Sequence, residues 1–311
     1  KAAEGYIASH RHGWKNPKHA QQWENTLAQY ASPVIGRLPV GAIAVEHLVR
    51  VLEPIWTTKP ETASRLRGRI EAVLDWAKGR GYRSGDNPAE WEGNLDVQLP
   101  RISKIKKVEH HAALAIDDMP AFMAELRNRD SISARALEFT ILTAARTGEV
   151  IGADWSEIDL DSSTWTIPKA RMKIDREHRV PLSPRACEIL VNLAHRSGPV
   201  FPGGAKGGHL SNMALAELLK GMRPGVTVHG TARSTFRDWI AERTNTPREV
   251  SEMALAHKIE SDVEAAYRRG DLLAKRAKLM QAWAQFCNSA YLGSRQRVIV
   301  LDMPARKRAP A

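Results

Sequence analysis

A basic stretch without hydrophobic periodicity divides the chain into two parts. From about Leu95 to His111 the apolar pattern is lost, and Pro100 interrupts the backbone. The stretch holds four cations within seven residues: Arg101, Lys104, Lys106 and Lys107. Such a segment cannot join a hydrophobic core and is typical of an interdomain linker. Because 311 residues suffice for two cores, we expect a first domain over 1–99, a basic linker over 100–111, a second domain over 112–291 and a C-terminal tail over 292–311.

The first domain shows helical periodicity and no alternation that would indicate a strand. Asn16 and Pro17 are residue types that begin a helix, and aromatic and apolar residues follow at spacings of four and three. We expect helices over about 17–30, 45–52 and 60–79. The last of them carries Arg65 and Arg69, which share a face. That face is either solvated, with Glu61 paired to Arg65, or in contact with phosphate, and the sequence favours neither.

The second domain combines helices with a short stretch of strand pattern. Residues 133–145 are rich in alanine and leucine, which predicts a buried helix. Between 155 and 182 the period changes, because Trp165 and Ile167, and then Val180 and Leu182, alternate with polar residues. The charged segment between these two pairs predicts a hairpin tip. We therefore expect a protein that is mainly α with a small β-sheet, a helical domain followed by an α+β domain.

The charge balance favours a polyanionic partner. The chain has 46 lysine and arginine residues against 35 aspartate and glutamate residues, a net charge of +11. Basic surfaces bind phosphate polyanions with release of counterions, and the clusters in the linker and the tail favour nucleic acid over an acidic protein or a membrane. No apolar run approaches the ~20 residues that span a bilayer, and no secretory leader is visible, so we expect a cytoplasmic protein.

The sequence predicts no cofactor and no metal ion. The loop over 198–208 is rich in glycine but lacks the lysine and hydroxyl residue that end a nucleotide-binding loop. Cys187 and Cys287 have no metal-type spacing and are expected to be buried free thiols. The adjacent residues His110 and His111 point apart, and no carboxylate partner for a metal site is evident.

A tyrosine beside two arginines and a glycine is the strongest candidate for chemistry. A tyrosine that attacks a phosphodiester needs arginines to neutralise the transition state, a cation to protonate the leaving 5′ oxygen, and an imidazole for the tyrosine proton. The chain offers Tyr267 as the nucleophile. The other groups present in the second domain are Arg146, Lys173, His229, Arg233 and His257. Each of them alone is more simply explained as a surface or helix-end residue.

Five spaced motifs together resemble those of the tyrosine recombinases, in particular the integrases of phages and genomic islands. They are Arg146-Thr-Gly-Glu149, the hairpin that ends in Val180-Pro-Leu182, the stretch His229–Trp239, Leu255-Ala-His257 and Ala266–Asp271. The resemblance spans residues 112–290. The first domain resembles the helical core-binding domain of the family by pattern and position.

The resemblance implies a site-specific recombinase that cleaves and rejoins DNA strands through a 3′-phosphotyrosyl intermediate, and so integrates or excises a mobile element. It implies that Tyr267 is the nucleophile, that Arg146 and Arg233 clamp the scissile phosphate, and that Lys173 is the general acid. His229 and His257 would assist proton transfer and phosphate binding. The DNA-binding residues would be Arg65, Arg69, Arg101, Lys104, Lys106 and Lys107. No cofactor is implied.

The resemblance also implies a setting. Members of this family act on double-stranded DNA as homotetramers, with accessory DNA-bending or directionality factors as further partners and without a membrane. The expected location is the bacterial cytoplasm, in association with the nucleoid. The tail over 292–311 is expected either to dock on a neighbouring copy or to be a frayed end.

Some positions leave alternatives open. The family usually spaces its histidine and second arginine three residues apart, whereas His229 and Arg233 are four apart, so Arg237 is an alternative partner. Lys169 and Arg171 are alternatives to the hairpin lysine as general acid. A type IB topoisomerase, a non-catalytic DNA-binding protein of this fold and a basic helical interaction protein are the alternative functions.

Overall fold

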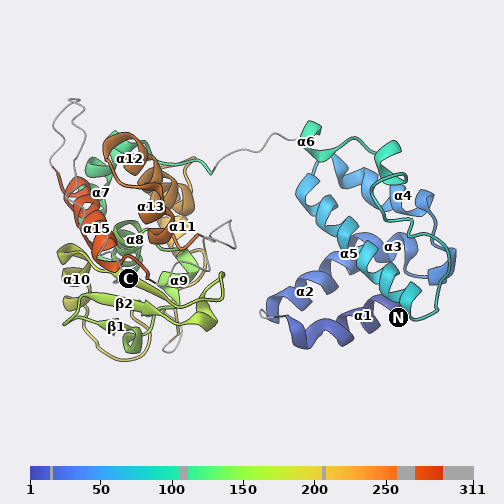
Figure 1. The fold of residues 1–311 in the computed structure, drawn as a ribbon, viewed down its shortest axis with the longest axis horizontal. Helices are drawn as coiled ribbons and strands as arrows, with labels where there is room; N and C mark the ends of the chain where they lie inside the picture. The colour runs from blue at the N-terminus through green and yellow to red at the C-terminus, as the bar shows by residue number, and fades with distance from the viewer. Residues whose placement is uncertain (15–16, 106–110, 205–207, 258–269, 290–311) are drawn as a thin grey trace, which may run out of the picture. The chain divides into compact units, whose positions relative to one another are not determined.

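The chain divides into two compact units, each with its own cluster of buried apolar side chains. The computed structural model describes residues 1–14, 17–105, 111–204, 208–257 and 270–289. The units are Lys1–Glu109 and His110–Ala311 (Figure 1). Their boundary falls in the basic stretch, and a short helix, α6 (Ile102–Ile105), lies within that stretch, where the sequence pattern predicted none.

The described residues of the first unit form helices joined by turns and irregular loops, with no strand among them. Its other helices are α1 (Ala2–His10), α2 (Pro17–Thr26), α3 (Ser32–Ile35), α4 (Val45–Trp56) and α5 (Pro60–Gly79), with short 3-10 or π turns at Arg11–Gly13, Leu27–Ala31, Val40–Ala42 and Leu95–Val97. The π turn joins α2 to α3 without a break, so the helix expected over 17–30 extends to Ile35. The apolar face of α5 buries Leu66, Ile70 and Leu74, as its periodicity predicted.

The two arginines of α5 have different surroundings. Arg69 donates to the carbonyl oxygen of Gln22 at 2.8 Å, and its guanidinium lies 5.6 Å from the centre of the Trp23 ring. Arg69 therefore fastens α2 to α5. Arg65 is exposed, and its only ion-pair neighbour in the described part of the chain is Glu61 at 3.8 Å. Such an exposed pair contributes little to stability, so Arg65 is the more accessible of the two to a phosphate.

The second unit surrounds a small sheet with helices. Its helices are α7 (Met119–Arg127), α8 (Ile132–Thr143), α9 (Thr147–Ile151), α10 (Pro184–Val191), α11 (Ala214–Met222), α12 (Thr235–Arg243), α13 (Arg248–Ala254) and α15 (Leu273–Cys287). Shorter turns lie at Ile116–Asp118, Trp155–Glu157, Lys169–Arg171 and Gly230–Ser234. The last of these is a π turn that leads directly into α12.

Three antiparallel strands form the sheet in the order β1 (Ile158–Asp159), β2 (Thr164–Ile167) and β3 (His178–Pro181). The register places Trp165 opposite Val180 and Ile167 opposite His178. Trp165, Ile167 and Val180 are buried, as their alternation predicted. The expectation of a mainly α protein with a small β-sheet is therefore confirmed.

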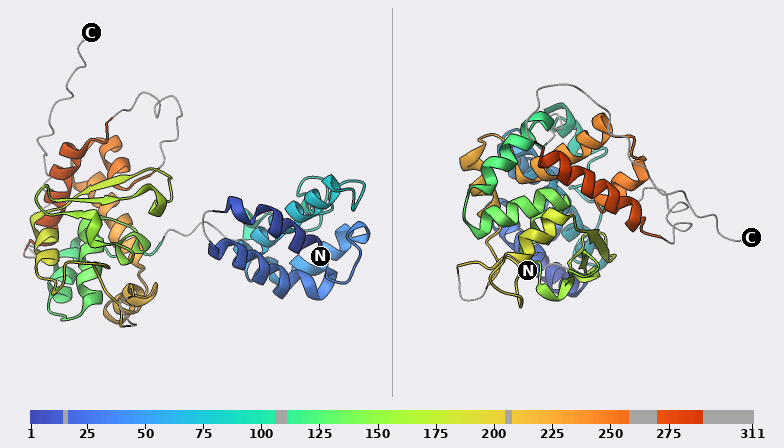
Figure 2. Two further views of the ribbon diagram at one scale, coloured as in Figure 1. Left: turned by 90° about the horizontal axis from the view of Figure 1, so that it is seen from below. Right: turned by 90° about the vertical axis from the view of Figure 1, so that its left-hand side faces the viewer.

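Helix α8 is the centre of the second unit. Its residues from Ala136 to Thr143 are all buried, which explains its alanine- and leucine-rich sequence. Helix α15 packs against α8, and Nε1 of Trp283 donates to the carbonyl oxygen of Ile141 at 2.8 Å. The same helix also packs against β3, close to the strands in both views of Figure 2. Through α15, the C-terminal part of the described chain is fixed to the sheet.

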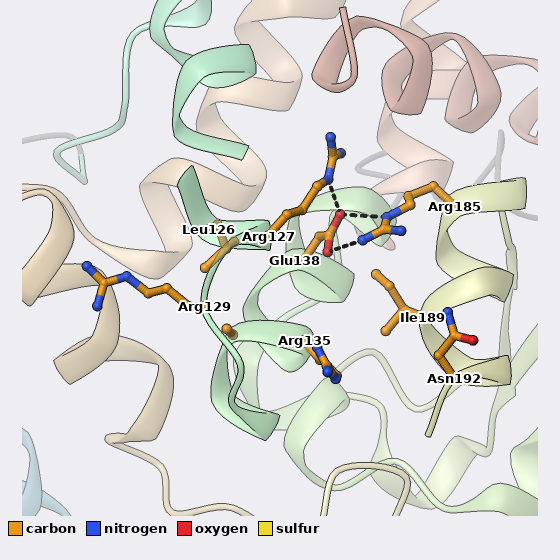
Figure 3. A pocket seen from close by; sticks show the side chains of 9 residues that line it. Leu126, Arg127, Arg129, Arg135, Glu138, Arg185, Ile189 and Asn192 are labelled. Carbon is orange, nitrogen blue, oxygen red and sulfur yellow. Dashed lines mark hydrogen bonds and ion pairs between the residues drawn. The ribbon is translucent and has the colours of Figure 1, made fainter. Parts of the chain in front are cut away.

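One buried carboxylate ties three helices of this core together. Glu138 on α8 accepts from Nε of Arg127 on α7 at 2.6 Å and from Nε of Arg185 on α10 at 2.9 Å (Figure 3). Only 4% of the Glu138 side chain is exposed, and the hydrogen bonds to Glu138 and Glu188 raise the pKa of Arg185. The adjoining cavity of about 100 Å³ is lined by Leu126, Arg127, Arg129, Ala134, Arg135, Glu138, Arg185, Ile189 and Asn192. Its arginines pair with carboxylates, so we assign it a structural role.

Candidate active site

Arg146 is held by a carboxylate at the start of α9. Helix α8 ends at Thr143. Its C-cap residue, Ala144, has the left-handed conformation (φ 49°), and Arg146 follows in extended conformation. The backbone N–H of Arg146 donates to Oε2 of Glu149 at 2.8 Å, and Nη1 donates to Oε1 at 2.7 Å. The Glu149 side chain is buried, whereas a quarter of the Arg146 side chain is exposed. Glu149 therefore fixes the orientation of the guanidinium, and part of the Arg146 side chain remains accessible to solvent.

Arg233 is the most deeply buried of the expected site residues that the structure describes. Its Nη1 donates to the carbonyl oxygen of Ala144 at 2.6 Å and its Nη2 to that of Leu255 at 2.7 Å. Its Nε is also buried but has no acceptor among the described residues. Burial and the nearby charge of Arg146 lower the pKa of the Arg233 guanidinium to about 10, so it is a cation at neutral pH. A buried donor without an acceptor is unusual in folded proteins and indicates a missing partner.

His257 completes a chain of polar contacts with Arg233. Nη2 of Arg233 lies 3.1 Å from Nε2 of His257, and Nδ1 of His257 lies 2.5 Å from Oε2 of Glu252. A guanidinium only donates, so Nε2 accepts and the Nδ1–H donates to the carboxylate. Glu252 is paired in turn with Arg237 at 2.8 Å. Arg237, which the sequence offered as an alternative to Arg233, therefore pairs with the carboxylate that holds His257.

A π turn accommodates the unusual spacing of His229 and Arg233. The backbone N–H of Thr235 bonds to the carbonyl oxygen of Gly230, five residues earlier, instead of four as in an α-helix. The wider turn takes up one additional residue between the histidine and the arginine, so both reach the same site. π turns inserted in α-helices are frequent at functional sites.

The imidazole of His229 is neutral at physiological pH. Its pKa is lowered to about 4 by partial burial and by the nearby groups Arg233, His111, Arg146 and His257. Groups that are far apart in the sequence therefore lie near His229, and three of them, Arg146, Arg233 and His257, are residues that the motifs singled out. His229 is exposed on part of its surface. It can therefore accept or donate a hydrogen bond without adding a charge.

Lys173 lies on the exposed hairpin tip between β2 and β3, as predicted. The two alternatives for its role are engaged elsewhere. Arg171 forms an ion pair with Glu157 and donates to the carbonyl oxygen of Glu149, and Lys169 lies 3.6 Å from Asp175. Arg171 therefore secures the base of the hairpin, which leaves Lys173 as the stronger candidate.

The sequence analysis missed His178. This residue begins β3 and is partly buried, and burial together with Arg276, Arg146 and Arg233 lowers its pKa to about 3. The sequence signal was its position, five residues after Lys173 and two residues before the Val180-Pro-Leu182 motif. A neutral imidazole therefore lies beside the two arginines expected to bind the phosphate.

Tyr267 lies outside the described residues, in the segment 258–269. The described chain resumes at Gly270, and the side chain of the next residue, Asp271, is held by two ion pairs. Its carboxylate pairs with Nη2 of Arg179 on β3 at 2.7 Å and with Nη2 of the buried Arg276 at 3.1 Å. Nη1 of Arg276 also donates to the carbonyl oxygen of Arg179 at 2.6 Å. Asp271, four residues after the tyrosine, is therefore anchored on β3, the strand that follows Lys173 in the hairpin.

The expected linker residues are only partly described. Arg101 and Lys104 are exposed. Lys106, Lys107 and the tail over 292–311 lie outside the described residues. Among the described residues, no group of three or more histidine, cysteine, aspartate or glutamate side chains could hold a metal ion. In the same part of the chain, no helix is long and apolar enough to cross a membrane.

Comparison with known families decides what this arrangement belongs to. Residues 113–271 match the phage integrase family, and residues 1–94 match the phage integrase central domain. The chain belongs to the phage integrase family. This is the family of the tyrosine-type site-specific recombinases, as the motifs indicated.

Individual integrases support the assignment. Prophage integrase IntZ of Escherichia coli K12 is 31% identical over 300 residues, which are 94% of this chain and 72% of the relative. Prophage integrase IntA of the same organism is 32% identical, over 84% of this chain and 63% of its own length. The integrase of Enterobacteria phage P4 is 28% identical, again over 84% of this chain and 63% of its own length. The chain thus spans about two-thirds of the length of these integrases.

Solved integrase structures share the fold. A lambda integrase tetramer bound to a Holliday junction has a TM-score of 0.65 at 14% identity, covering 84% of this chain and 77% of the other. The Tn1549 transposon integrase in complex with circular intermediate DNA has a TM-score of 0.62 at 10% identity, covering 86% and 95%. At these identities the comparison establishes a common fold and leaves the roles of individual residues to the geometry.

Proposed function

We propose that the chain carries the strand-cleaving activity of a site-specific recombinase that integrates or excises a mobile element. The phenolic oxygen of Tyr267 bonds to the scissile phosphorus, and the bond from phosphorus to the 5′ oxygen breaks. The tyrosine proton passes to an imidazole, and Lys173 protonates the 5′ oxygen. The 5′-hydroxyl of another strand then reverses these steps, so the DNA is rejoined without ATP.

The observation that carries this proposal is the buried, incompletely paired guanidinium of Arg233. Two of its nitrogens are fixed on carbonyl oxygens, and the third is a buried donor without an acceptor among the described residues. Arg146 is close enough to lower its pKa. Two arginines held close together in this way favour the binding of an anion. A phosphodiester supplies both the charge and the acceptor oxygen.

The arginines would act mainly in the transition state. When tyrosine attacks, charge accumulates on the non-bridging oxygens, and prearranged donors stabilise that charge more than the charge of the ground state. Fixed cations are already present as Arg146 and Arg233. The lowered pKa values of His178 and His229 keep both imidazoles neutral, so each ring can donate one hydrogen bond and has one nitrogen that can accept a proton.

Lys173 has the properties of a general acid. It is exposed on the tip of a two-stranded hairpin, so DNA can reach it. The hairpin is attached to the site at its base, through Arg171 on one side and His178 on the other. A lysine placed in this way can approach the leaving 5′ oxygen from the side opposite the nucleophile.

The remaining residues would hold the duplex. We infer that the domain over 1–99 is a core-type DNA-binding domain, that 100–111 is a basic linker and that 112–291 is the catalytic domain. Phosphate contacts would come from Arg65, Arg101 and Lys104, which are exposed, and from Lys106 and Lys107. Arg69 is a weaker candidate because it is bonded to α2. We further propose a homotetramer on DNA in the bacterial nucleoid, assisted by accessory DNA-bending or directionality factors, with the tail docked on a neighbouring copy.

Covalent trapping tests the proposed activity. The protein is incubated with a nicked duplex that carries a candidate attachment site, so that the released fragment diffuses away and the covalent intermediate persists. We expect a protein–DNA adduct that resists denaturant, that is lost in Tyr267→Phe, and that persists in Tyr82→Phe, which alters an exposed tyrosine of the first unit. An adduct that formed equally in Tyr267→Phe would refute the assignment of the nucleophile.

A further inference from the structure

A short strap of chain lies across the π turn that carries His229 and Arg233. The strap is His111–Leu114, the first described residues of the second unit. The carbonyl oxygen of Ala112 accepts from the backbone N–H of Thr227 at 2.9 Å and from Oγ1 of the same residue at 3.2 Å. The carbonyl oxygen of Leu114 accepts from Oγ1 of Thr235 at 2.6 Å. These bonds fix the strap on both sides of the π turn.

The strap and the π turn touch through their backbones. A Cβ atom added at Gly230 would lie 2.2 Å from the carbonyl oxygen of Ala112, so no larger residue fits there without displacing the strap. The N–H of Gly230 donates to Oγ1 of Thr227 at 2.9 Å, the same hydroxyl that donates to Ala112. The glycine beside His229 therefore has a defined function, which is to admit the strap.

This contact places a second imidazole on His229. The ring centroids of His111 and His229 lie 4.5 Å apart, with 56° between their planes. This is within the range of favourable aromatic contacts. Both residues are exposed, so the pair lies at the surface of the site, where a bound DNA backbone would pass. None of the five motifs of the second domain includes His111.

We propose that His111 is a positioning residue for His229, and that its ring fixes the orientation of the His229 imidazole beside the two phosphate-binding arginines. The role assigned to His229 rests on the proposed recombinase function, whereas the contact itself does not. An exposed imidazole on one side of a turn would otherwise rotate freely about its side-chain bonds, and ordering it would cost binding energy at each cleavage event. Packing against His111 removes that freedom in advance.

Together with burial and Arg233, the tilted ring of His111 helps to keep His229 uncharged. The charged or titratable groups that act on His229 are Arg233, Arg146, His257 and His111 itself. All of these groups disfavour a positive charge on His229. The ring of His111 also reduces the contact of His229 with water, which disfavours the charged form further. Loss of the His111 ring therefore removes one neighbouring titratable group and part of the cover, and both changes raise the pKa of His229.

Single-turnover cleavage of the nicked duplex gives the first test. We expect His111→Ala to slow cleavage about 2- to 12-fold, which corresponds to the loss of one aromatic contact. His111→Phe keeps a ring without a titratable nitrogen and is expected to restore most of the rate. In a His229→Ala background, His111→Ala is expected to cause no further loss. His209→Ala, which alters an exposed histidine elsewhere in the same unit, is the matched control.

The outcomes of that test are distinct. A wild-type rate for His111→Ala, failure of His111→Phe to restore the rate, or additive losses in the His229→Ala background would each overturn the proposal. Unfolding temperatures of the same variants separate a lost orientation from a lost fold, because the proposal requires the cleavage defect at an unchanged unfolding temperature.

An NMR titration of the His229 ring gives a second test that does not depend on catalysis. In the wild type the pKa of His229 is expected near 4, the value that its surroundings impose. We expect this pKa to rise toward 6.5 in His111→Ala, and to rise less in His111→Phe, which keeps the cover and loses only the titratable group. Equal pKa values in all three proteins would refute the contact even if cleavage occurred. A raised pKa in a protein that formed no adduct would support the contact and count against the recombinase function alone.

Discussion

Arg233 and His257, 24 residues apart in the sequence, are joined by a hydrogen bond of 3.1 Å. This bond determines which nitrogen of His257 carries a proton, because the guanidinium can only donate. The other nitrogen donates to Glu252, and Glu252 is paired with Arg237. A phosphate bound by Arg233 would therefore meet a cation whose position depends on three further side chains.

Arg233→Lys tests whether the fork of the guanidinium matters beyond its charge. A lysine has one nitrogen and cannot bond both Ala144 and Leu255 while also reaching a phosphate. We expect cleavage to fall by about 10²- to 10³-fold, with DNA binding changed only a few-fold. Arg185→Lys is the control, since it alters another arginine that is paired in the same unit, around Glu138. It should lower the unfolding temperature and leave the cleavage rate per folded molecule unchanged.

Glu252→Gln tests the support of His257. The amide keeps the size of the side chain but is a weaker acceptor for the Nδ1–H of His257, and it loses the ion pair with Arg237. We expect cleavage to slow by about 10-fold, in line with the loss of an orienting carboxylate behind a working histidine. Arg237→Gln removes only the outer ion pair and should slow cleavage less. Equal losses in the two variants would argue that the ion pair, rather than the bond to His257, is what matters.

Acid should destabilise the second unit through His178. The pKa of this ring is lowered to about 3 in the folded protein, below its ordinary value of 6.5. Above pH 6.5 the ring is neutral in both states, so its full contribution is present there. As pH falls from 6.5 toward 3, the unfolded chain binds a proton that the folded chain does not, and the free energy of unfolding decreases by ~1.4 kcal/mol per pH unit. His229 acts in the same direction, less strongly because of its exposure.

Denaturant unfolding of His178→Asn at several pH values checks this prediction. Asparagine does not titrate, so the decrease between pH 6.5 and pH 4 should be smaller than in the wild type. Lowered carboxyl pKa values, such as that of Asp271, also destabilise the protein in acid, but they are common to both proteins and cancel in the difference. His209→Asn should follow the wild-type curve. A decrease in His178→Asn as steep as in the wild type would contradict the assignment.

Asp271→Asn tests the anchor that follows the tyrosine. The substitution leaves the buried Arg276 without its carboxylate, and removing one partner of a buried pair costs about 3–5 kcal/mol. Because Tyr267 is four residues upstream, we also expect slower adduct formation with unchanged DNA binding. Arg179→Gln removes only the partly exposed side of the network and should cost less than about 1 kcal/mol. Normal adduct formation by folded Asp271→Asn would show that the anchor serves stability alone.

Local patterns predicted much of the fold. Alternation identified the buried residues of β2 and β3, and the apolar face of α5 followed from helical spacing. The pairing of Arg146 with Glu149 was also accessible, because the two residues are three apart at a helix start. These features depend on neighbours in the sequence, which is why periodicity and capping patterns report them.

Features that depend on distant partners were not predictable. Arg276 lies in a helix among other cations and has the pattern of a solvated residue, yet only 1% of its side chain is exposed. It is buried because Asp271 and the carbonyl oxygen of Arg179, 97 residues away, satisfy its donors. The π turn could not be foreseen either, because its irregular hydrogen bonding depends on the contacts that His229 and Arg233 make with distant residues. The contact of Arg69 with α2 was likewise not foreseen, and its expected role in DNA binding stays a prediction.

The residue that becomes linked to DNA tests the central claim most directly. The trapped adduct is digested with protease and nuclease, and the peptide that retains a nucleotide is identified by mass spectrometry. We predict a single modified peptide from the segment 258–269, with the phosphate on Tyr267 through a 3′ linkage. A phosphate on any other residue, or a 5′ linkage, would contradict the proposed mechanism.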